Sequence, residues 1–109
     1  MNQHRILFDM QKSTKQPDWD DLRFFLEVVR AGTASAAAKR LGVDYTTVAR
    51  RIRALEEAMS ALLFDKSRST GFTLTQDGQQ LVSHAETMEG AMQAACEQVS
   101  GSGSALSGL

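Results

Sequence analysis

The feature that most constrains this chain is a pair of short helical segments joined by a tight turn at Gly42. In the second segment the apolar residues recur at helical spacing and predict one buried stripe, made of Val48, Ile52, Leu55 and Met59. The opposite face is polar and basic. Two helices joined by a short turn that contains glycine, the second of them amphipathic, are typical of a helix-turn-helix. We therefore predict a helix from about Asp44, its N-cap, to Met59.

Another helix is predicted to precede this pair. Asp18 is a suitable N-cap and Gly32 a suitable stop for it. Between them, apolar residues recur at helical spacing at Trp19, Leu22, Phe25, Leu26 and Val29. The next helix is expected to start at residue 33 or 34 and to end at residue 41, with alanines that let a neighbouring helix approach closely. Val43, in the following turn, is expected to fill the core between the helices.

Two short apolar runs follow, at residues 62–64 and 72–74, and the segment between them is polar and contains Gly71. Apolar runs on either side of such a segment predict the two strands of a hairpin. The connecting segment carries Lys66 and Arg68, so the hairpin is expected to have a basic tip. The predicted fold is mostly α: a winged helix-turn-helix of three helices and a small β-hairpin, followed by a long helix.

The long helix is predicted over residues 76–100, with Thr75 as its N-cap. Its apolar residues recur in alternating steps of four and three, the heptad pattern that marks a helix that packs along another long helix. These residues are Leu81, Ala85, Met88, Met92, Ala95 and Val99. A second copy of the chain is the expected partner, which predicts a homodimer. The alternative is that this stripe folds back on its own domain.

Composition limits the other possibilities. The chain has 109 residues with 42% hydrophobic residues, enough for one compact core. Residues 1–17 are expected to be a mobile tail, 18–75 the winged domain, and 101–109 a flexible tail. No apolar run approaches the roughly 20 residues of a membrane span, and the start lacks a secretory signal. The lone Cys96 cannot form an internal disulfide, which favours a reducing cytoplasm.

The net charge of −1 is an average over unlike segments. Residues 30–75 carry eight basic and four acidic side chains, whereas residues 76–109 carry four acidic side chains and no Lys or Arg. The positive charge is therefore concentrated in the segment that contains the helix-turn-helix and the hairpin. This distribution suits contact with phosphates, although charge clustering alone is also common on helical surfaces.

Over residues 22–81 the chain resembles the N-terminal DNA-binding domain of LysR-type transcriptional regulators. The matching motifs are LRFF (22–25) with Val28 and Gly32, SAAAKRL (35–41), VDYTTVARRIRALE (43–56), LFDK (63–66) and LTQDG (74–78). The resemblance implies a winged helix-turn-helix that dimerises through its linker helix. It also implies a small-molecule effector bound by a separate domain, which needs far more chain than follows residue 99.

Some positions depart from the family pattern. Tyr45 stands where an amide side chain often reads bases, Ala49 stands where Ser is usual, and Ser60 stands where Gly commonly ends the helix. Asp44 can cap a helix as Ser does, so the departures do not threaten the fold. The base preference of the family is therefore not transferred to this chain.

Candidate DNA contacts follow from this arrangement. A recognition helix enters the major groove with its N-terminal end toward the bases, which predicts a reading set of Tyr45, Thr46, Thr47 and Arg50. Ser35 is expected to meet phosphate at the start of its helix. Phosphate or minor-groove contacts are expected for Arg51, Arg53, Lys66, Ser67 and Arg68. Arg51 and Arg53 can instead be surface charges, and Arg53 can pair with Glu56 or Glu57.

The predicted function is sequence-specific binding of double-stranded DNA by a dimeric regulator at an inverted repeat. The alternative is a protein-interaction module that uses the same fold without reading DNA. An enzyme is not expected, because no nucleophile–base arrangement or phosphate-binding loop is visible, and no cofactor is expected. A metal site is not expected either, because His84 and Cys96 lie about 18 Å apart along one helix.

Overall fold

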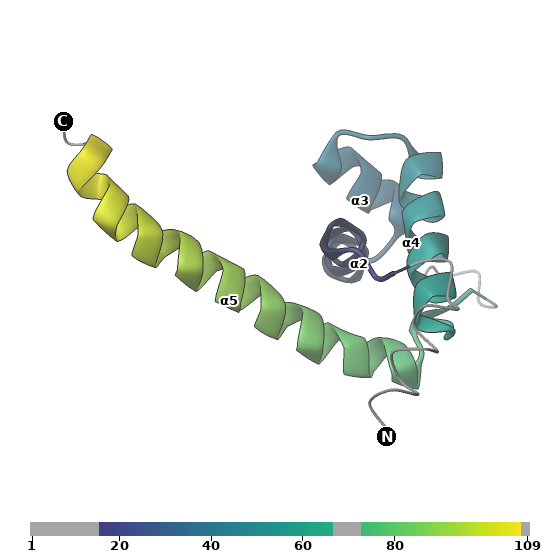
Figure 1. Cartoon of the computed structure of the whole chain (residues 1–109). Helices are drawn as coiled ribbons and strands as arrows, with labels where there is room; N and C mark the ends of the chain where they lie inside the picture. The colour runs from purple at the N-terminus through teal and green to yellow at the C-terminus, as the bar shows by residue number, and fades with distance from the viewer. Residues whose placement is uncertain (1–15, 67–72, 108–109) are drawn as a thin grey trace, which may run out of the picture.

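A computed structural model describes residues 16–66 and 73–107 of the chain (Figure 1). Three helices form the body of the molecule, and a two-stranded hairpin and a long helix follow them. In chain order the elements are α2 (Trp19–Ala31), α3 (Ala34–Leu41), α4 (Tyr45–Met59), β1 (Phe64–Asp65), β2 (Thr73–Leu74) and α5 (Gln76–Ser107). The mostly α winged fold predicted from the sequence is confirmed.

Side-chain caps set the starts of α2 and α3. The sequence predicts the cap at Asp18, whereas it predicts only that the next helix starts at residue 33 or 34. Asp18 accepts a hydrogen bond from the backbone N–H of Asp20 at 3.0 Å, and the Thr33 hydroxyl accepts one from the N–H of Ala36 at 3.0 Å. Gly32 and Gly42 end the two helices with φ of 91° and 69°. Both glycines adopt the left-handed conformation that L side chains rarely occupy, which explains the sharp stops.

Helix α4 has the predicted bounds, with Asp44 at the N-cap position and Met59 as its last residue, but the cap and the burial of Met59 differ from the prediction. Asp44 occupies the N-cap position, yet its side chain makes no capping hydrogen bond. Ser60 follows the helix as its C-cap and adopts φ 54°, where a glycine would be unstrained. Met59 is 38% exposed, so the prediction that it belongs to the buried stripe is wrong. It is the last residue of α4 and lies beyond the core that covers Val48, Ile52 and Leu55.

The core lies between α2, α3 and α4, and the base of α5 and the hairpin complete it. Its fully buried large side chains are Phe25, Leu26, Val28, Val48, Ile52, Leu55 and Leu63. Val43 is partly buried against this cluster, as predicted. Three alanines of α3, Ala34, Ala37 and Ala38, are buried, and α2 and α4 both pack against this helix, as predicted for small residues there.

The hairpin is shorter than predicted and begins later. Strands β1 and β2 are antiparallel, with Phe64 opposite Leu74 and Asp65 opposite Thr73. Leu62 and Leu63, which the sequence places in the first strand, form a connection instead. Their backbone groups form hydrogen bonds outside the sheet. The Leu63 N–H donates to the Glu56 carboxylate, and the Leu62 carbonyl accepts from the Thr75 hydroxyl. The expected basic tip, including Ser67 and Arg68, lies outside the described residues.

Helix α5 begins where predicted. The Thr75 hydroxyl accepts a hydrogen bond from the Gly78 N–H at 3.0 Å, as an N-cap does. The helix continues to Ser107, past residue 100, where the sequence predicts a flexible tail because Gly101 and Gly103 disfavour a helix. Figure 1 shows α5 extending away from the three-helix body. No helix in the part of the chain that the structure describes is long and apolar enough to cross a membrane.

Candidate nucleic-acid interface

The first two turns of α4 present a polar face to solvent. Tyr45 is 51% exposed, and Thr46 and Arg50 are also exposed, whereas Thr47 is half-buried. An open hollow of about 440 Å³ is lined by Tyr45, Thr46, Ala49, Arg50 and Arg53. The structure therefore brings four residues of the predicted DNA contacts around one concavity. Ala49, which sequence reasoning noted only as a missing hydroxyl, belongs to the same surface.

Two arginines of this face are available for a ligand. Arg50 and Arg53 are exposed, and neither forms an ion pair with any residue that the structure describes. The predicted alternative, in which Arg53 pairs with Glu56 or Glu57, does not occur. Glu56 is buried and points toward the hairpin instead. Both guanidinium groups are therefore positive charges without a local acidic partner in the described chain.

Arg51 differs from its neighbours, because it binds α2. Its guanidinium lies 3.0 Å from Asp21 and 3.4 Å from Asp20, and it sits 5.1 Å from the centre of the Phe24 ring. The hydrogen bond to Asp21 raises the pKa of Arg51, with desolvation opposing the rise. Arg51 thus ties α4 to α2, a contact across 30 residues that helical spacing cannot reveal.

Ser35 lies in the first turn of α3 and is exposed. Thr33 provides the cap of that helix, so the Ser35 hydroxyl is not used for capping. Such a hydroxyl, beside the N-terminal amides of a helix, suits an anionic group. The position agrees with the phosphate contact that the sequence predicts, which remains a prediction.

The base of the wing is held by a residue that sequence reasoning did not identify. Glu56 is only 7% exposed, and its carboxylate accepts a hydrogen bond from the Leu63 N–H at 2.9 Å. The ammonium of Lys66 lies 3.9 Å from the same carboxylate. Because a buried carboxylate needs partners, this pair links the end of α4 to the start of the hairpin. The Leu-Glu pair at the end of the recognition-helix motif was its only signal in the sequence.

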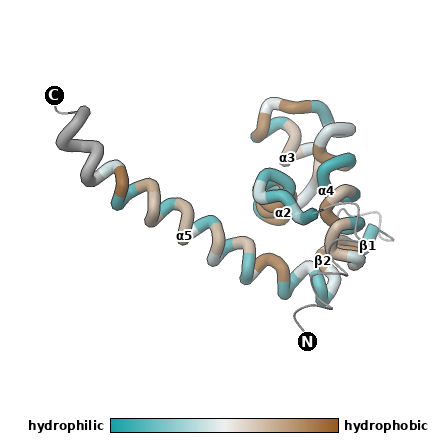
Figure 2. The backbone as a smooth tube through the Cα atoms, in the orientation of Figure 1, coloured by the Kyte–Doolittle hydropathy of each residue, from teal (hydrophilic) through white to brown (hydrophobic). Residues whose placement is uncertain are grey.

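The apolar stripe of α5 divides into two parts. Leu81 and Ala85 are 8% and 0% exposed, because they pack against the core of their own domain. Met88, Met92 and Val99 are 47%, 52% and 70% exposed, and Ala95 is exposed too. The alternative of folding back therefore holds for the first part of the stripe only. Figure 2 shows hydrophobic residues recurring along the part of α5 that leaves the body.

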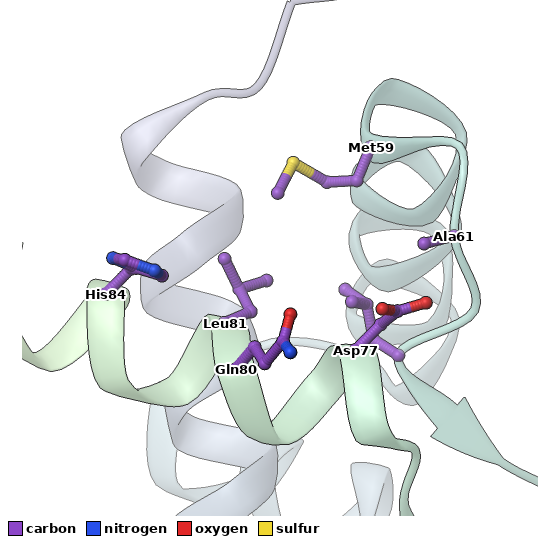
Figure 3. A pocket seen from close by; sticks show the side chains of 7 residues that line it. Met59, Ala61, Asp77, Gln80, Leu81 and His84 are labelled. Atoms are coloured by element: carbon purple, nitrogen blue, oxygen red, sulfur yellow. The ribbon is translucent and has the colours of Figure 1, made fainter.

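A hollow of about 200 Å³ lies where α5 passes the end of α4 (Figure 3). Met59 and Leu81 extend their side chains into it from the two helices, and His84 lies at its edge on α5. Cys96 is twelve residues further along α5 and is exposed. His84 and Cys96 therefore lie on separate parts of the same helix, as their spacing in the sequence predicts.

Residues 19–79 match the bacterial regulatory helix-turn-helix proteins of the lysR family, and this match covers more than half of the chain. The chain belongs to the lysR family. It carries the helix-turn-helix DNA-binding domain of that family, with α3 and α4 as the helix pair. The resemblance seen in the sequence motifs is confirmed.

Two curated relatives and one solved structure illustrate the likeness. The Mau operon transcriptional activator of Paracoccus denitrificans is 45% identical over 47 residues, 43% of this chain and 17% of that protein. The transcriptional regulator TdcA of Escherichia coli is 34% identical over 85 residues, 78% of this chain and 27% of that protein. The crystal structure of the CbnR_DBD-DNA complex is 28% identical with a TM-score of 0.70, over 74% of this chain and 92% of that one. The chain thus spans under a third of these curated relatives, which are transcriptional regulators.

Proposed function

We propose that this lysR-family chain binds double-stranded DNA sequence-specifically through the N-terminal half of α4, as part of a dimeric transcriptional regulator. The observation that carries the proposal is the exposed face around the 440 Å³ hollow, where Arg50 and Arg53 lack acidic partners among the described residues. Long cationic side chains at a helix face that fits a major groove suit this ligand. No catalytic role is proposed.

Within the groove, the residues have different tasks. Tyr45, Thr46 and Thr47 lie in the first turn of α4, the end that meets base edges in a recognition helix. Arg50 lies one turn later and is long enough to contact a guanine with two hydrogen bonds. Arg53 lies further along the helix and is assigned to phosphate, which contributes affinity without discrimination.

The flanking contacts are assigned to the backbone of the DNA. Ser35 at the start of α3 and Lys66 at the base of the wing are both exposed. Ser67 and Arg68 are assigned to the same strand or the adjacent minor groove. Arg51 is retained only as a secondary phosphate contact, because its ion pairs with Asp20 and Asp21 must weaken before it can turn outward. Its proposed main task is to fix the angle between α4 and α2.

The exposed part of the α5 stripe supports a homodimer. Met88, Met92, Ala95 and Val99 form an apolar face that leaves the body of the domain. Burial of such a face against a second copy is favourable, and a two-fold dimer requires an inverted repeat in the DNA. Binding of a small-molecule effector is assigned to a further domain, since the curated relatives are several times longer than this chain.

Replacing Arg50 tests the reading role. We expect Arg50→Ala to lower affinity for a site selected from random DNA by about 1–3 kcal/mol and to relax base preference at one position. Arg53→Ala serves as the matched control on the same face. It is expected to weaken all sequences alike and to reduce the salt slope of log Kobs by about one unit. Fluorescence polarisation on selected and random duplexes at several salt concentrations measures both.

Equal loss on selected and random DNA for Arg50→Ala would remove it from the reading set. Absence of salt-dependent binding by the unaltered chain would overturn the proposed function as a whole and favour a protein-interaction module. The two outcomes are distinct, because the first leaves DNA binding intact.

A charge on the exposed stripe tests the dimer. We expect Met92→Glu to raise the dimer dissociation constant at least about tenfold, because a carboxylate would replace a large apolar contact in the interface. Gln93→Glu is the matched control, since it adds the same charge to the same exposed turn but beside the stripe. Sedimentation equilibrium over a concentration series measures both variants. A similar loss for the two would show that charge alone, and not the stripe, governs association.

A further inference from the structure

One ion pair joins the body of the domain to the middle of α5. Arg30, at the end of α2, donates to both carboxylate oxygens of Glu89, at 3.0 and 2.6 Å. The two side chains are each 36% exposed, and 59 residues separate them in the sequence. The hydrogen bond to Arg30 lowers the pKa of Glu89, and the same bond raises that of Arg30. The contact is therefore a two-point clamp between charged groups.

The place of this clamp along α5 matters. Leu81 and Ala85 pack into the core, and Glu89 follows one turn after Ala85. From Gly90 to Ser100 every residue of α5 is exposed. Within the described side chains, the Arg30–Glu89 pair is thus the outermost attachment of α5 to its domain. Two supports, the apolar packing and the ion pair, fix the direction in which the helix leaves (Figure 1).

The surrounding charges favour this pairing. Arg30 is also near Glu27 and Glu86, which raise its pKa through space. Glu27, however, lies 3.2 Å from Arg40 of α3 and is shared with it. A planar guanidinium that meets both oxygens of one carboxylate has a defined orientation, unlike a single-point contact. Exposed ion pairs contribute little to the free energy of folding. The consequence of this pair is therefore the direction that it gives to α5.

Because α5 extends away from the domain, a small change in its angle at the Arg30–Glu89 pair produces a larger displacement at its far end. Residues 90–100 add about 16 Å of helix beyond the pair. A tilt of about 10° displaces the end of this segment by roughly 3 Å, close to the roughly 3.4 Å rise of one base pair. In a dimer joined through α5, a change in this angle would change the separation of the two copies of α4.

We propose that the Arg30–Glu89 ion pair is a specificity determinant for half-site spacing: it selects the distance between inverted half-sites that the dimer accepts. The inference rests on the proposed function, since it requires DNA reading by α4 and dimerisation through α5. Arg30 and Glu89 lie outside the polar face of α4 and outside the apolar stripe of α5. The inference and the proposed function can therefore be tested separately.

The test uses the complete chain and duplexes that carry two inverted copies of a half-site selected from random DNA, with the spacing varied in steps of one base pair. The variants are Arg30→Glu, Glu89→Arg and the double exchange. We expect the unaltered chain to favour one spacing over its neighbours by about tenfold, and each single variant to reduce this preference to about threefold or less. The double exchange restores the pair with reversed charges and is expected to restore the preference.

Controls match each charge change. Arg23→Glu alters the same charge on α2 at a residue that pairs with Asp20, and Glu97→Arg does so on the exposed part of α5. Both are expected to keep the spacing preference. Affinity for a duplex with one half-site is expected to change equally in each variant and its control, because the reading face is untouched.

An unchanged spacing preference in both single variants, or a double exchange that fails to restore it, overturns the inference. So does an unaltered chain that binds half-sites without any spacing preference. If the unaltered chain shows no specific DNA binding at all, the proposed function is overturned instead. Binding to the duplex with one half-site distinguishes that result from the others, because it requires reading but no spacing.

Discussion

Gly78→Ala is expected to destabilise the domain by about 3 kcal/mol, the upper part of the range for overpacking. Gly78 lies in the first turn of α5, and a Cβ there would clash with the Leu63 carbonyl oxygen and lie 2.9 Å from the Leu74 side chain. The carbonyl belongs to the backbone and already accepts the Thr75 N–H at 3.0 Å, so it cannot move without loss. The gain of about 1 kcal/mol from replacing glycine in a helix is too small to compensate.

The matched control is Gly90→Ala on the same helix. Gly90 has no atom within 4 Å of its added Cβ, so this variant is expected to be neutral or stabilising by up to about 1 kcal/mol. Urea denaturation followed by circular dichroism measures both, with the midpoint as the readout. Equal stability of the two variants would show that the 63–64 segment can retreat from α5, and that this contact does not fix the wing.

The local elements of the fold are predictable because their signals are local. The cap at Asp18, the stops at Gly32 and Gly42, and the spacing of Val48, Ile52 and Leu55 need only neighbouring residues to be interpreted. The structure agrees at each of these positions. The polar face of α4 follows from the same spacing, which is why the exposed reading set could be proposed from the sequence.

Contacts between distant segments were not predictable in this way. Arg51 looks like its neighbours Arg50 and Arg53 along the helix, and only the position of α2 shows that it meets Asp21. Glu56 looks like a solvated residue, yet the turn at Ser60 brings the Leu63 N–H to it. In both cases the partner is set by how helices pack, and periodicity carries no information about that.

The stripe of α5 is an intermediate case. Its period places these apolar residues on one face of the helix, but a period cannot say which surface covers each of them. Leu81 and Ala85 meet their own core because the Thr75–Leu62 hydrogen bond holds the start of α5 against the domain. Only Met88 and the residues beyond it remain for a partner, so a dimer interface is predicted to be shorter than the stripe.

Phe25→Ala is expected to have the largest effect on stability, a loss of about 3–5 kcal/mol. Phe25 is fully buried in α2, and its ring centre lies 5.4 Å from that of Phe64 in β1 with the planes tilted by 50°. Truncation removes the apolar burial and leaves a cavity at the aromatic contact between α2 and β1. Since small domains are stable by only about 5–15 kcal/mol, a substantial unfolded fraction is expected.

A conservative replacement separates volume from aromatic geometry. Phe25→Leu keeps most of the buried area and is expected to cost under half of the loss seen for alanine. Because α2 and β1 both pack against this ring, both variants are also expected to weaken DNA binding in proportion to the fraction of unfolded protein. On cooling, the Phe25→Leu variant is expected to regain DNA binding before the Phe25→Ala variant does. A loss below about 1 kcal/mol for alanine would contradict the cavity argument, because it would require the wing and α2 to close over the missing ring.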